Sequence, residues 1–279
     1  MPIYTPEPVL RNPARLAREM FADLWAGRGL AWRLMIRNLS AQYRQTVLGY
    51  LWAFLPPLFS AGTFIALRHT GILSTGPTPV PYAAWAIIGT FLWQVFVEAI
   101  TSPMNQVGQA RAMLTKINFP REALVLAGVG EVLFNFAVRL IVLIPLLLWF
   151  QVPVNAGSLL ILPAALAALL LLGVTVGVLL IPVSLLYQDI GRAIPLVLPF
   201  VMVLSGAVFP IPSTGPARLL ATWNPVAPLL ETCRNALTGQ PLDLLPAALL
   251  VTALSLVFLF IGWALYRLAM PHLIERMGG

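Results

Sequence analysis

Long apolar stretches separated by short polar segments dominate the chain. Six of them hold about 20 mostly apolar residues, which is the length that an α-helix needs to cross the hydrocarbon core of a bilayer. The expected spans are 47–68, 82–104, 123–149, 157–187, 194–211 and 244–266. The pattern therefore predicts an all-α polytopic membrane protein, with residues 1–46 as an N-terminal segment and 47–279 as a domain of six transmembrane helices.

The composition supports the bilayer as the solvent for most of this chain. Only 10% of its residues are charged and 59% are hydrophobic, whereas a soluble domain carries about 25% charged residues. The formal net charge of +7 is not gathered on one basic surface, so no nucleic-acid partner is expected. Of the 17 Lys and Arg residues, 13 fall on the side of the N-terminal segment and three on the other. Because cytoplasmic loops are enriched in basic residues, both termini are expected in the cytoplasm.

The N-terminal segment is predicted to hold an interfacial amphipathic helix, which lies on the membrane rather than across it. Apolar residues recur at helical spacing, Gly27 and Gly29 predict a break, and a second helix is expected from about Leu30. Three arginines share one face of this second helix: Arg33, Arg37 and Arg44. They indicate either an anchor that meets anionic lipid or a surface that meets the anionic head of a substrate.

Span 123–149 carries a polar stripe on one helical face. Its members are Glu131, Asn135 and Arg139, and Glu98 in span 82–104 lies at a similar depth. A charge at the centre of a membrane helix costs about 2.5–3.5 kcal/mol on insertion scales, so it usually marks a pair or a pathway. The stripe therefore indicates either a structural cluster, in which Glu98 or Glu131 neutralises Arg139, or the lining of a hydrated conduit. In span 157–187, the small-xxx-small sequence GVTVG predicts close helix packing.

The segment WNPVAPLLETCRNALTGQP, residues 223–241, predicts a helix of about 14 residues, which is too short to cross a membrane. Asn224 is a suitable cap, Pro225 is expected at the first helical position, and Gly239 ends the helix. Glu231 and Arg234 are spaced to pair at i, i+3. With Trp223 and the preceding FPIPSTGP, the segment predicts a re-entrant outer-face helical hairpin, and a helix lying flat on the outer surface is the alternative.

The chain shows no catalytic constellation. Asp23, Asp189 and Asp243 are isolated, which excludes the Asp-rich metal–diphosphate motif of membrane prenyl transferases. The single lysine, Lys116, is not part of a phosphate-binding P-loop. One cysteine and two distant histidines give no metal-ligand spacing. We expect no metal, bound cofactor or ATPase activity in this chain, so any ATP and Mg²⁺ would bind a partner subunit.

Four stretches together resemble the membrane (permease) subunit of type-2 bacterial ABC exporters for polysaccharides, which serve O-antigen, capsule and teichoic acid. They are YRQTVLGYLWAFLPP, LTKINFPREAL, YQDIGRAIP and FP…WNPVAPLLETCRNALTG, and they follow the expected order over nearly the whole chain. The resemblance implies a half-transporter of the inner membrane that pairs with a second copy and two cytoplasmic nucleotide-binding subunits to export a lipid-linked glycan. An exporter of a drug or smaller lipid is the alternative within the superfamily, and an integral-membrane glycosyl- or prenyl-transferase is the alternative outside it.

The resemblance also implies which segments transmit the action of the nucleotide-binding subunits. They are the N-terminal interfacial helix, residues 108–122 and residues 187–193. In the two loops, the resemblance assigns this role in ATPase coupling to Arg111, Lys116, Arg121, Gln188, Asp189 and Arg192.

Two consecutive prolines, Pro56 and Pro57, fall inside the first predicted span. Proline removes a backbone hydrogen bond and kinks a helix, and a membrane tolerates this where the freed carbonyls face protein or a cavity. We therefore expect a kink that widens a conduit. Nearby aromatic rings offer faces on which sugars can stack, or else they form an interfacial belt; they are Tyr43, Tyr50, Trp52 and Phe54.

Overall fold

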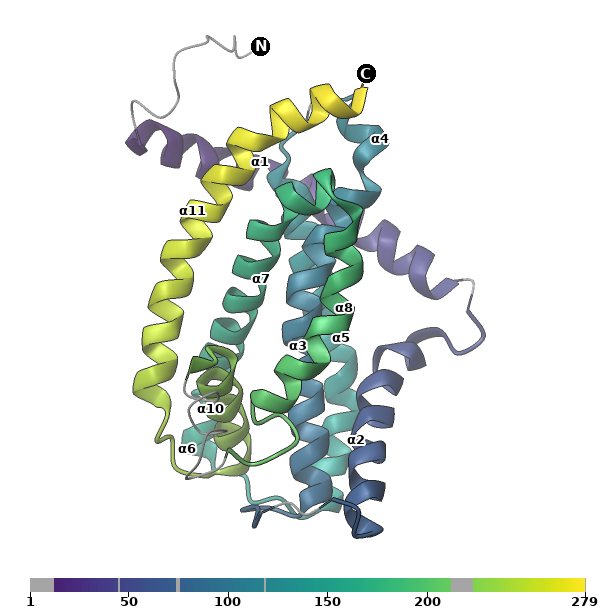
Figure 1. Cartoon of the computed structure of the whole chain (residues 1–279), viewed down its shortest axis with the longest axis vertical. Helices are drawn as coiled ribbons and strands as arrows, with labels where there is room; N and C mark the ends of the chain where they lie inside the picture. Colours follow the sequence, from purple (N-terminus) through teal and green to yellow (C-terminus); the bar gives the residue numbers. More distant parts are fainter. Residues whose placement is uncertain (1–12, 45, 74–75, 118, 212–222, 279) are drawn as a thin grey trace.

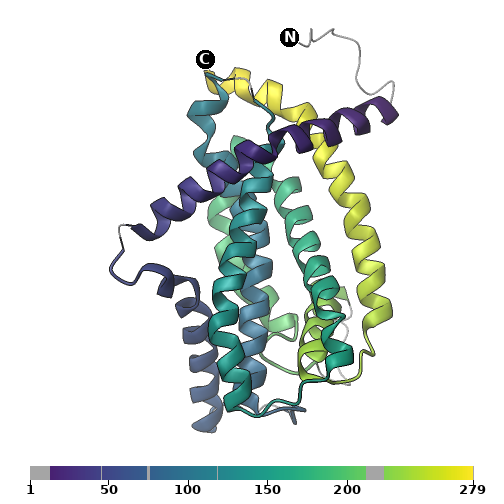
Figure 2. The same ribbon diagram turned by 180° about the vertical axis from the view of Figure 1, so that it is seen from behind.

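The computed structural model describes residues 13–44, 46–73, 76–117, 119–211 and 223–278, and every regular element in these ranges is a helix. Helices long and apolar enough to cross a membrane are α3 (Tyr82–Gln109), α5 (Glu122–Trp149), α7 (Leu162–Leu186) and α11 (Leu245–Gly278). They run side by side along the long axis of the molecule (Figures 1 and 2). The prediction of an all-α, multi-pass membrane protein is confirmed.

The count of six spanning helices is not confirmed, because two of the predicted spans form shorter helices. Helix α2 (Leu55–His69) has 15 residues and α8 (Gln188–Leu204) has 17. At 1.5 Å per residue they are about 22 and 26 Å long, which is less than the roughly 30 Å of a hydrocarbon core. In the described ranges, four helices qualify as spans by length and composition.

The N-terminal helix α1 (Pro13–Arg44) is continuous over 32 residues, so the break predicted at Gly27 and Gly29 was wrong. A Cβ atom at Gly27 would lie 3.2 Å from Cβ of Ala123 at the start of α5, whereas one at Gly29 would meet nothing within 4 Å. Gly27 therefore permits a close approach between helices and does not end one. Helix α1 passes across one end of the bundle (Figures 1 and 2), with Leu34 buried and Trp32 62% exposed.

The two prolines lie in the first turn of α2, so the predicted kink inside a continuous span was also wrong. A short 3-10 helix, η2 (Gly49–Ala53), comes first, and Pro56 and Pro57 then occupy the first turn of α2. A first turn needs no intrahelical N–H donors, which is why proline fits there. Gly49 has φ of +50°, a left-handed conformation that glycine adopts at little cost. The first predicted span is thus two separate helical pieces.

Helix α3 lies at the centre of the molecule and contacts α2, α5, α7 and α10. Its contact with α7 depends on the small residues of GVTVG. A Cβ atom at Gly173 would lie 2.5 Å from Cβ of Ala99, and one at Gly177 would lie 2.6 Å from the carbonyl oxygen of Ile100. Larger side chains would separate the two helices, so the prediction of close packing is confirmed.

Helix α10 (Val226–Thr238) lies near the end of the bundle opposite α1 (Figure 1). Its first backbone N–H donates to Oδ1 of Asn224 at 3.0 Å, and it ends at Gly239, where φ is +66°. Pro225 precedes the helix instead of occupying its first position. The helix packs against α3, α7, α11 and the short α6 (Ala156–Leu159), and most of its residues are buried. Residues 212–222, the other part of the predicted hairpin, lie outside the described residues.

Candidate functional site

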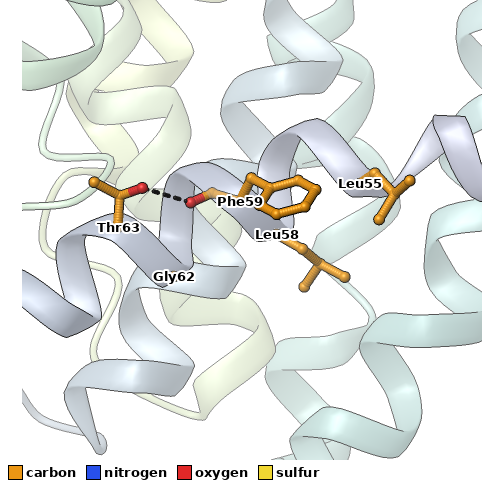
Figure 3. A pocket seen from close by; sticks show the side chains of 5 residues that line it. All are labelled: Leu55, Leu58, Phe59, Gly62 and Thr63. Carbon is orange, nitrogen blue, oxygen red and sulfur yellow. Dashed lines mark hydrogen bonds between the residues drawn. The ribbon is translucent and has the colours of Figure 1, made fainter.

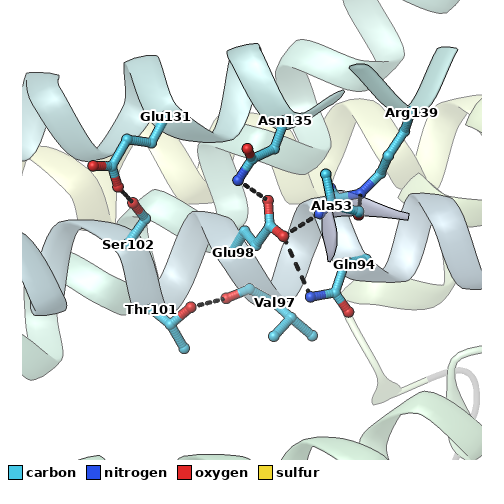
Figure 4. Close-up of polar contacts among 9 residues, drawn as sticks. All are labelled: Ala53, Gln94, Val97, Glu98, Thr101, Ser102, Glu131, Asn135 and Arg139. Atoms are coloured by element: carbon cyan, nitrogen blue, oxygen red, sulfur yellow. Dashed lines mark hydrogen bonds and ion pairs between the residues drawn. The ribbon is translucent and has the colours of Figure 1, made fainter. Parts of the chain in front are cut away.

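Two polar stripes face each other between α3 and α5. Residues four apart lie on the same face of a helix, and both helices carry polar side chains at this spacing. The stripe on α3 is Gln94, Glu98, Ser102 and Gln106, and the stripe on α5 is Glu131, Asn135 and Arg139. We call these seven residues the polar ladder, and Figure 4 shows six of them pointing toward one another.

Arg139 is the buried cation of the polar ladder, with 1% of its side chain exposed. Its Nη2 forms an ion pair with Oε1 of Glu98, and Nδ2 of Asn135 donates to the other carboxylate oxygen at 3.2 Å. Its Nε donates to the carbonyl oxygen of Ala53 at 2.7 Å. Of the two acids considered from the sequence, Glu98 is therefore the partner of Arg139. A buried charge is tolerated where an opposite charge and hydrogen bonds compensate it.

Glu131 lies at the other end of the ladder among neutral donors. Oγ of Ser102 donates to its carboxylate at 2.6 Å, and Nε2 of Gln106 donates to the other oxygen. The amide oxygen of Gln106 in turn accepts from Nδ2 of Asn38 at 2.6 Å. Because Asn38 belongs to α1, these bonds connect the ladder to the helix that crosses the end of the bundle.

Sequence reasoning missed four members of this network: Asn38, Gln94, Ser102 and Gln106. A signal for three of them was present, because polar residues recur every four positions from 94 to 106, in step with the stripe at 131–139. The groups of the ladder bond to one another, which is what the structural-cluster interpretation requires. The hydrated conduit stays a prediction.

The arginines predicted for substrate binding lie on α1. Arg33 and Arg37 are exposed, and Nε of Arg37 donates to Oδ1 of Asn38 at 3.1 Å. Arg44 is the last residue of α1, and its side chain and that of Tyr43 lie outside the described part of the structure. The backbone thus places all three arginines on one helix, near the start of the segment that leads to α2.

The predicted aromatic residues lie in that segment. Tyr50 is 55% exposed and Trp52 is 52% exposed, whereas Phe54 is half-buried. The ring of Tyr50 lies 6.0 Å from the ring of Phe134 on α5. Residues of this segment and of α5 border an open groove of about 480 Å³, lined by Thr46, Val47, Leu48, Gly49, Tyr50, Leu51, Phe54, Val138, Ile141 and Val142.

A second open groove of about 450 Å³ lies on α2, lined by Leu55, Leu58, Phe59, Gly62 and Thr63 (Figure 3). Its single hydroxyl is already engaged, because Oγ1 of Thr63 donates to the carbonyl oxygen of Phe59 at 2.9 Å. Both grooves are mainly apolar, which suits hydrocarbon chains better than ions.

Arg234 of α10 is buried at the opposite end of the molecule. It donates to the carbonyl oxygens of Gly206 at 2.9 Å and Ala207 at 2.5 Å, and its Cζ lies 3.8 Å from the ring centroid of Trp85 on α3. The expected pair with Glu231 is not among the ion pairs of the described residues, since the backbone carbonyls take the guanidinium donors. Burial raises the pKa of the Glu231 carboxyl, and the nearby Arg234 charge opposes this shift.

The remaining residues of the predicted outer hairpin differ in their exposure. Trp223 is 86% exposed and Pro225 is also exposed. Asn224 is half-buried, and its Nδ2 donates to Oγ of Ser205 at 2.8 Å. Asn224 thus connects the start of α10 to the end of α8.

The residues predicted for ATPase coupling lie at the α1 end of the bundle. Arg111 begins the short helix α4 (Arg111–Leu114), and its Nη2 donates to the carbonyl oxygens of Ser184 at 3.4 Å and Leu185 at 3.2 Å. Lys116 is exposed. The carbonyl oxygen of Arg121 accepts from the hydroxyl of Tyr266 on α11 at 3.2 Å.

The second predicted coupling loop forms the start of α8. Asp189 and Arg192 are exposed and lie 3.8 Å apart between Oδ1 and Nη1. Gln188 is the first residue of the helix, and its side chain is outside the described part. Among the described residues, no group of three or more His, Cys, Asp or Glu is arranged to hold a metal ion.

These features define a helical membrane protein whose interior holds a paired polar ladder. Residues 30–238 match the model of the ABC-2 type transporter family, so the chain belongs to this family. The O-antigen export system permease protein RfbA of Myxococcus xanthus is 30% identical over 126 residues, which cover 45% of this chain and 46% of that protein. The match thus spans about half the length of this relative. The polysialic acid transport protein KpsM of Escherichia coli is 26% identical over 243 residues, or 84% of this chain and 91% of that protein.

Proposed function

We propose that the chain is the membrane subunit of an ABC transporter that exports a lipid-linked polysaccharide across the bacterial inner membrane. The family match over residues 30–238 carries this proposal, and the relatives named for O-antigen export and polysialic acid transport support the substrate class. The family implies an ATP-binding partner subunit. Neither the export of a drug or smaller lipid nor a transferase activity is favoured by these names.

In the proposed assembly two copies of the chain pair with two ATP-binding subunits, and the α1 end faces the cytoplasm. The α1 side carries 13 basic residues and the other side carries three, which supports this orientation. Helix α8 leaves most of its residues exposed in one copy, and α2 buries only Pro57 and Ala61. We infer that both helices complete a six-helix unit against lipid and the second copy.

We further propose that α10 is the described part of a re-entrant hairpin of the outer face. With 13 residues, α10 is too short to cross. Its enclosure by α3, α7 and α11, far from α1, supports a helix that enters the protein from the outer side.

The lipid-linked substrate approaches between α1 and the segment before α2. Arginine binds phosphate oxygens with two parallel hydrogen bonds, and Arg33 and Arg37 are exposed on α1 to offer them. The apolar groove beside residues 46–54 suits the hydrocarbon tail. The exposed rings of Tyr50 and Trp52 then offer stacking surfaces to sugars.

Reconstitution of the chain with its ATP-binding subunit in vesicles tests this function. We expect ATP to drive a fluorescent lipid-linked glycan to the far leaflet, and the chain alone to hydrolyse no ATP, because no P-loop is present in its sequence. The matched control replaces the glycan lipid with a fluorescent phospholipid. Equal transport of both lipids, or of neither, would contradict a glycan exporter.

A further inference from the structure

Arg267 on α11 joins three elements at the α1 end. Its Nη1 lies 2.8 Å from Oδ2 of Asp23 and 3.5 Å from Oε1 of Glu122, and its Nη2 lies 3.7 Å from Oε2 of Glu19. Glu19 and Asp23 are one turn apart on α1, and Glu122 is the first residue of α5. One guanidinium therefore bridges α1, α5 and α11.

Neighbouring side chains of α11 strengthen this junction. Nε1 of Trp263 donates to Oε1 of Glu122 at 3.4 Å, and the hydroxyl of Tyr266 donates to the carbonyl oxygen of Arg121 at 3.2 Å. The ring of Trp263 also meets the ring of Phe21 on α1 edge-to-face, with centroids 5.5 Å apart. With Arg267 19% exposed and Glu122 7% exposed, the ion pair between them is partly shielded from water and salt, whereas the side chains of Glu19 and Asp23 are 42% and 39% exposed.

Arg111 makes a second junction at the same end. It begins α4 and donates to the carbonyl oxygens of Ser184 and Leu185 in the last turn of α7. A cation is favourable at a helix C-terminus, where the carbonyl groups lack intrahelical partners. The next residues of the chain start α8, at Gln188. Arg111 therefore joins the segment before α5 to the end of α7, which leads directly into α8.

We propose that Arg267 and Arg111 link α1, residues 108–122 and residues 187–193 into one mechanical unit, so that the ATP-binding subunit moves the three segments together. This inference rests on the proposed function, because those segments are the ones expected to contact that subunit. Both arginines are positioning residues, since their guanidinium groups are directed at other helices of this chain. The loss of either junction separates ATP hydrolysis from transport.

The experiment measures glycan transported per ATP hydrolysed by the reconstituted complex carrying Arg267→Met, Arg111→Met or both. We expect assembly and basal ATP hydrolysis to persist while the double variant transports about tenfold less glycan per ATP, which lies within the usual range of coupling free energies between sites. Arg267→Lys, which keeps a charge but reaches fewer carboxylates, retains part of the coupling. Arg28→Met is the matched control, because Arg28 is exposed on α1 and stacks on Trp25 of the same helix.

A cross-link separates coupling from folding. In the variant Asp23→Cys with Arg267→Cys, a short bis-maleimide reconnects α1 to α11 without charge, and the native Cys233 is buried and does not compete. Restored transport per ATP supports the junction. If the cross-link restores nothing, or if transport and ATP hydrolysis fall in parallel, Arg267 only maintains the fold and the inference fails. If the unmodified complex shows no ATP-driven glycan transport, the proposed function fails, whatever the variants do.

Discussion

Arg139 donates from Nε to the carbonyl oxygen of Ala53 at 2.7 Å. In an uninterrupted helix this carbonyl would accept from the backbone N–H four residues on, but that residue is Pro57, which has no N–H. Arg139 thus supplies the donor that proline cannot. The same side chain pairs with Glu98, so one residue of α5 compensates both a half-buried carboxylate of α3 and the break before α2.

A double-mutant cycle between Arg139 and Pro57 tests this relationship. Arg139→Lys keeps a charge for Glu98, but its single nitrogen cannot occupy both the Nε position beside Ala53 and the Nη2 position beside Glu98. Pro57→Ala supplies a backbone N–H to Ala53 in its place. We expect Arg139→Lys to cost about 1 kcal/mol less in the Pro57→Ala background, which is the net value of one hydrogen bond. Thermal unfolding in nanodiscs measures the difference. Additive effects of the two substitutions would show that the Ala53 carbonyl does not depend on Arg139.

The ion pair itself predicts a larger effect. Arg139→Leu leaves Glu98, whose side chain is 17% exposed, without its cation, and breaking a pair of this kind costs up to about 3–5 kcal/mol when both groups are buried. Adding Glu98→Gln removes the unpaired charge and is expected to restore part of the stability. Glu131→Gln is the control, because the carboxylate of Glu131 is held by the neutral donors Ser102 and Gln106. The interpretation of Arg139 as a paired charge is wrong if Arg139→Leu keeps full stability and transport.

The long apolar helices could be predicted because their signal is local. Twenty apolar residues in a row leave few alternatives to a membrane span, so α3, α5, α7 and α11 were found from the sequence. The start of α2 could not be decided in the same way. Proline is compatible both with a kink and with a first helical turn, and the donor to Ala53 lies 86 residues away on α5. The prediction of a helix break at Gly27 failed for a similar reason. The glycine is needed for the close approach of Ala123, which is distant in sequence.

Only some residues of the polar ladder could be predicted from the sequence. Glu98, Glu131 and Arg139 stand out because a charge is costly inside a span. Ser102 and Gln106 are neutral, so neither gives a strong sequence signal when each helix is considered alone. Their role follows only once α3 and α5 are placed in register, which depends on tertiary packing that one sequence does not display.

The arginines of α1 predict how substrate reaches the protein. Alanine at Arg33, Arg37 and Arg44 removes the donors proposed for the diphosphate head, so glycan export and the stimulation of ATP hydrolysis by glycan lipid are expected to fall. Lysine at the same positions keeps the charge but loses the paired hydrogen bonds, so it is expected to impair export less than alanine. Arg28→Ala is the control on the same helix, since it stacks on Trp25. Unchanged export by the triple alanine variant, with normal membrane insertion, would leave α1 as a simple anchor.

The contact between α3 and the turn after α8 predicts opposite effects for two glycine substitutions. A Cβ atom at Gly89 would overlap the carbonyl oxygen of Ala207, which is an acceptor of Arg234, whereas one at Gly29 would meet nothing within 4 Å. Gly89→Ala must therefore push Arg234 and the turn away from α3, and overpacking of this kind costs about 1–3 kcal/mol. Gly29→Ala lies inside α1 and is expected to stabilise by roughly 0.5–1 kcal/mol through helix propensity. Thermal unfolding of both variants, together with protease access to α10, measures the difference. Equal stability of the two would mean that Arg234 does not hold the turn against α3.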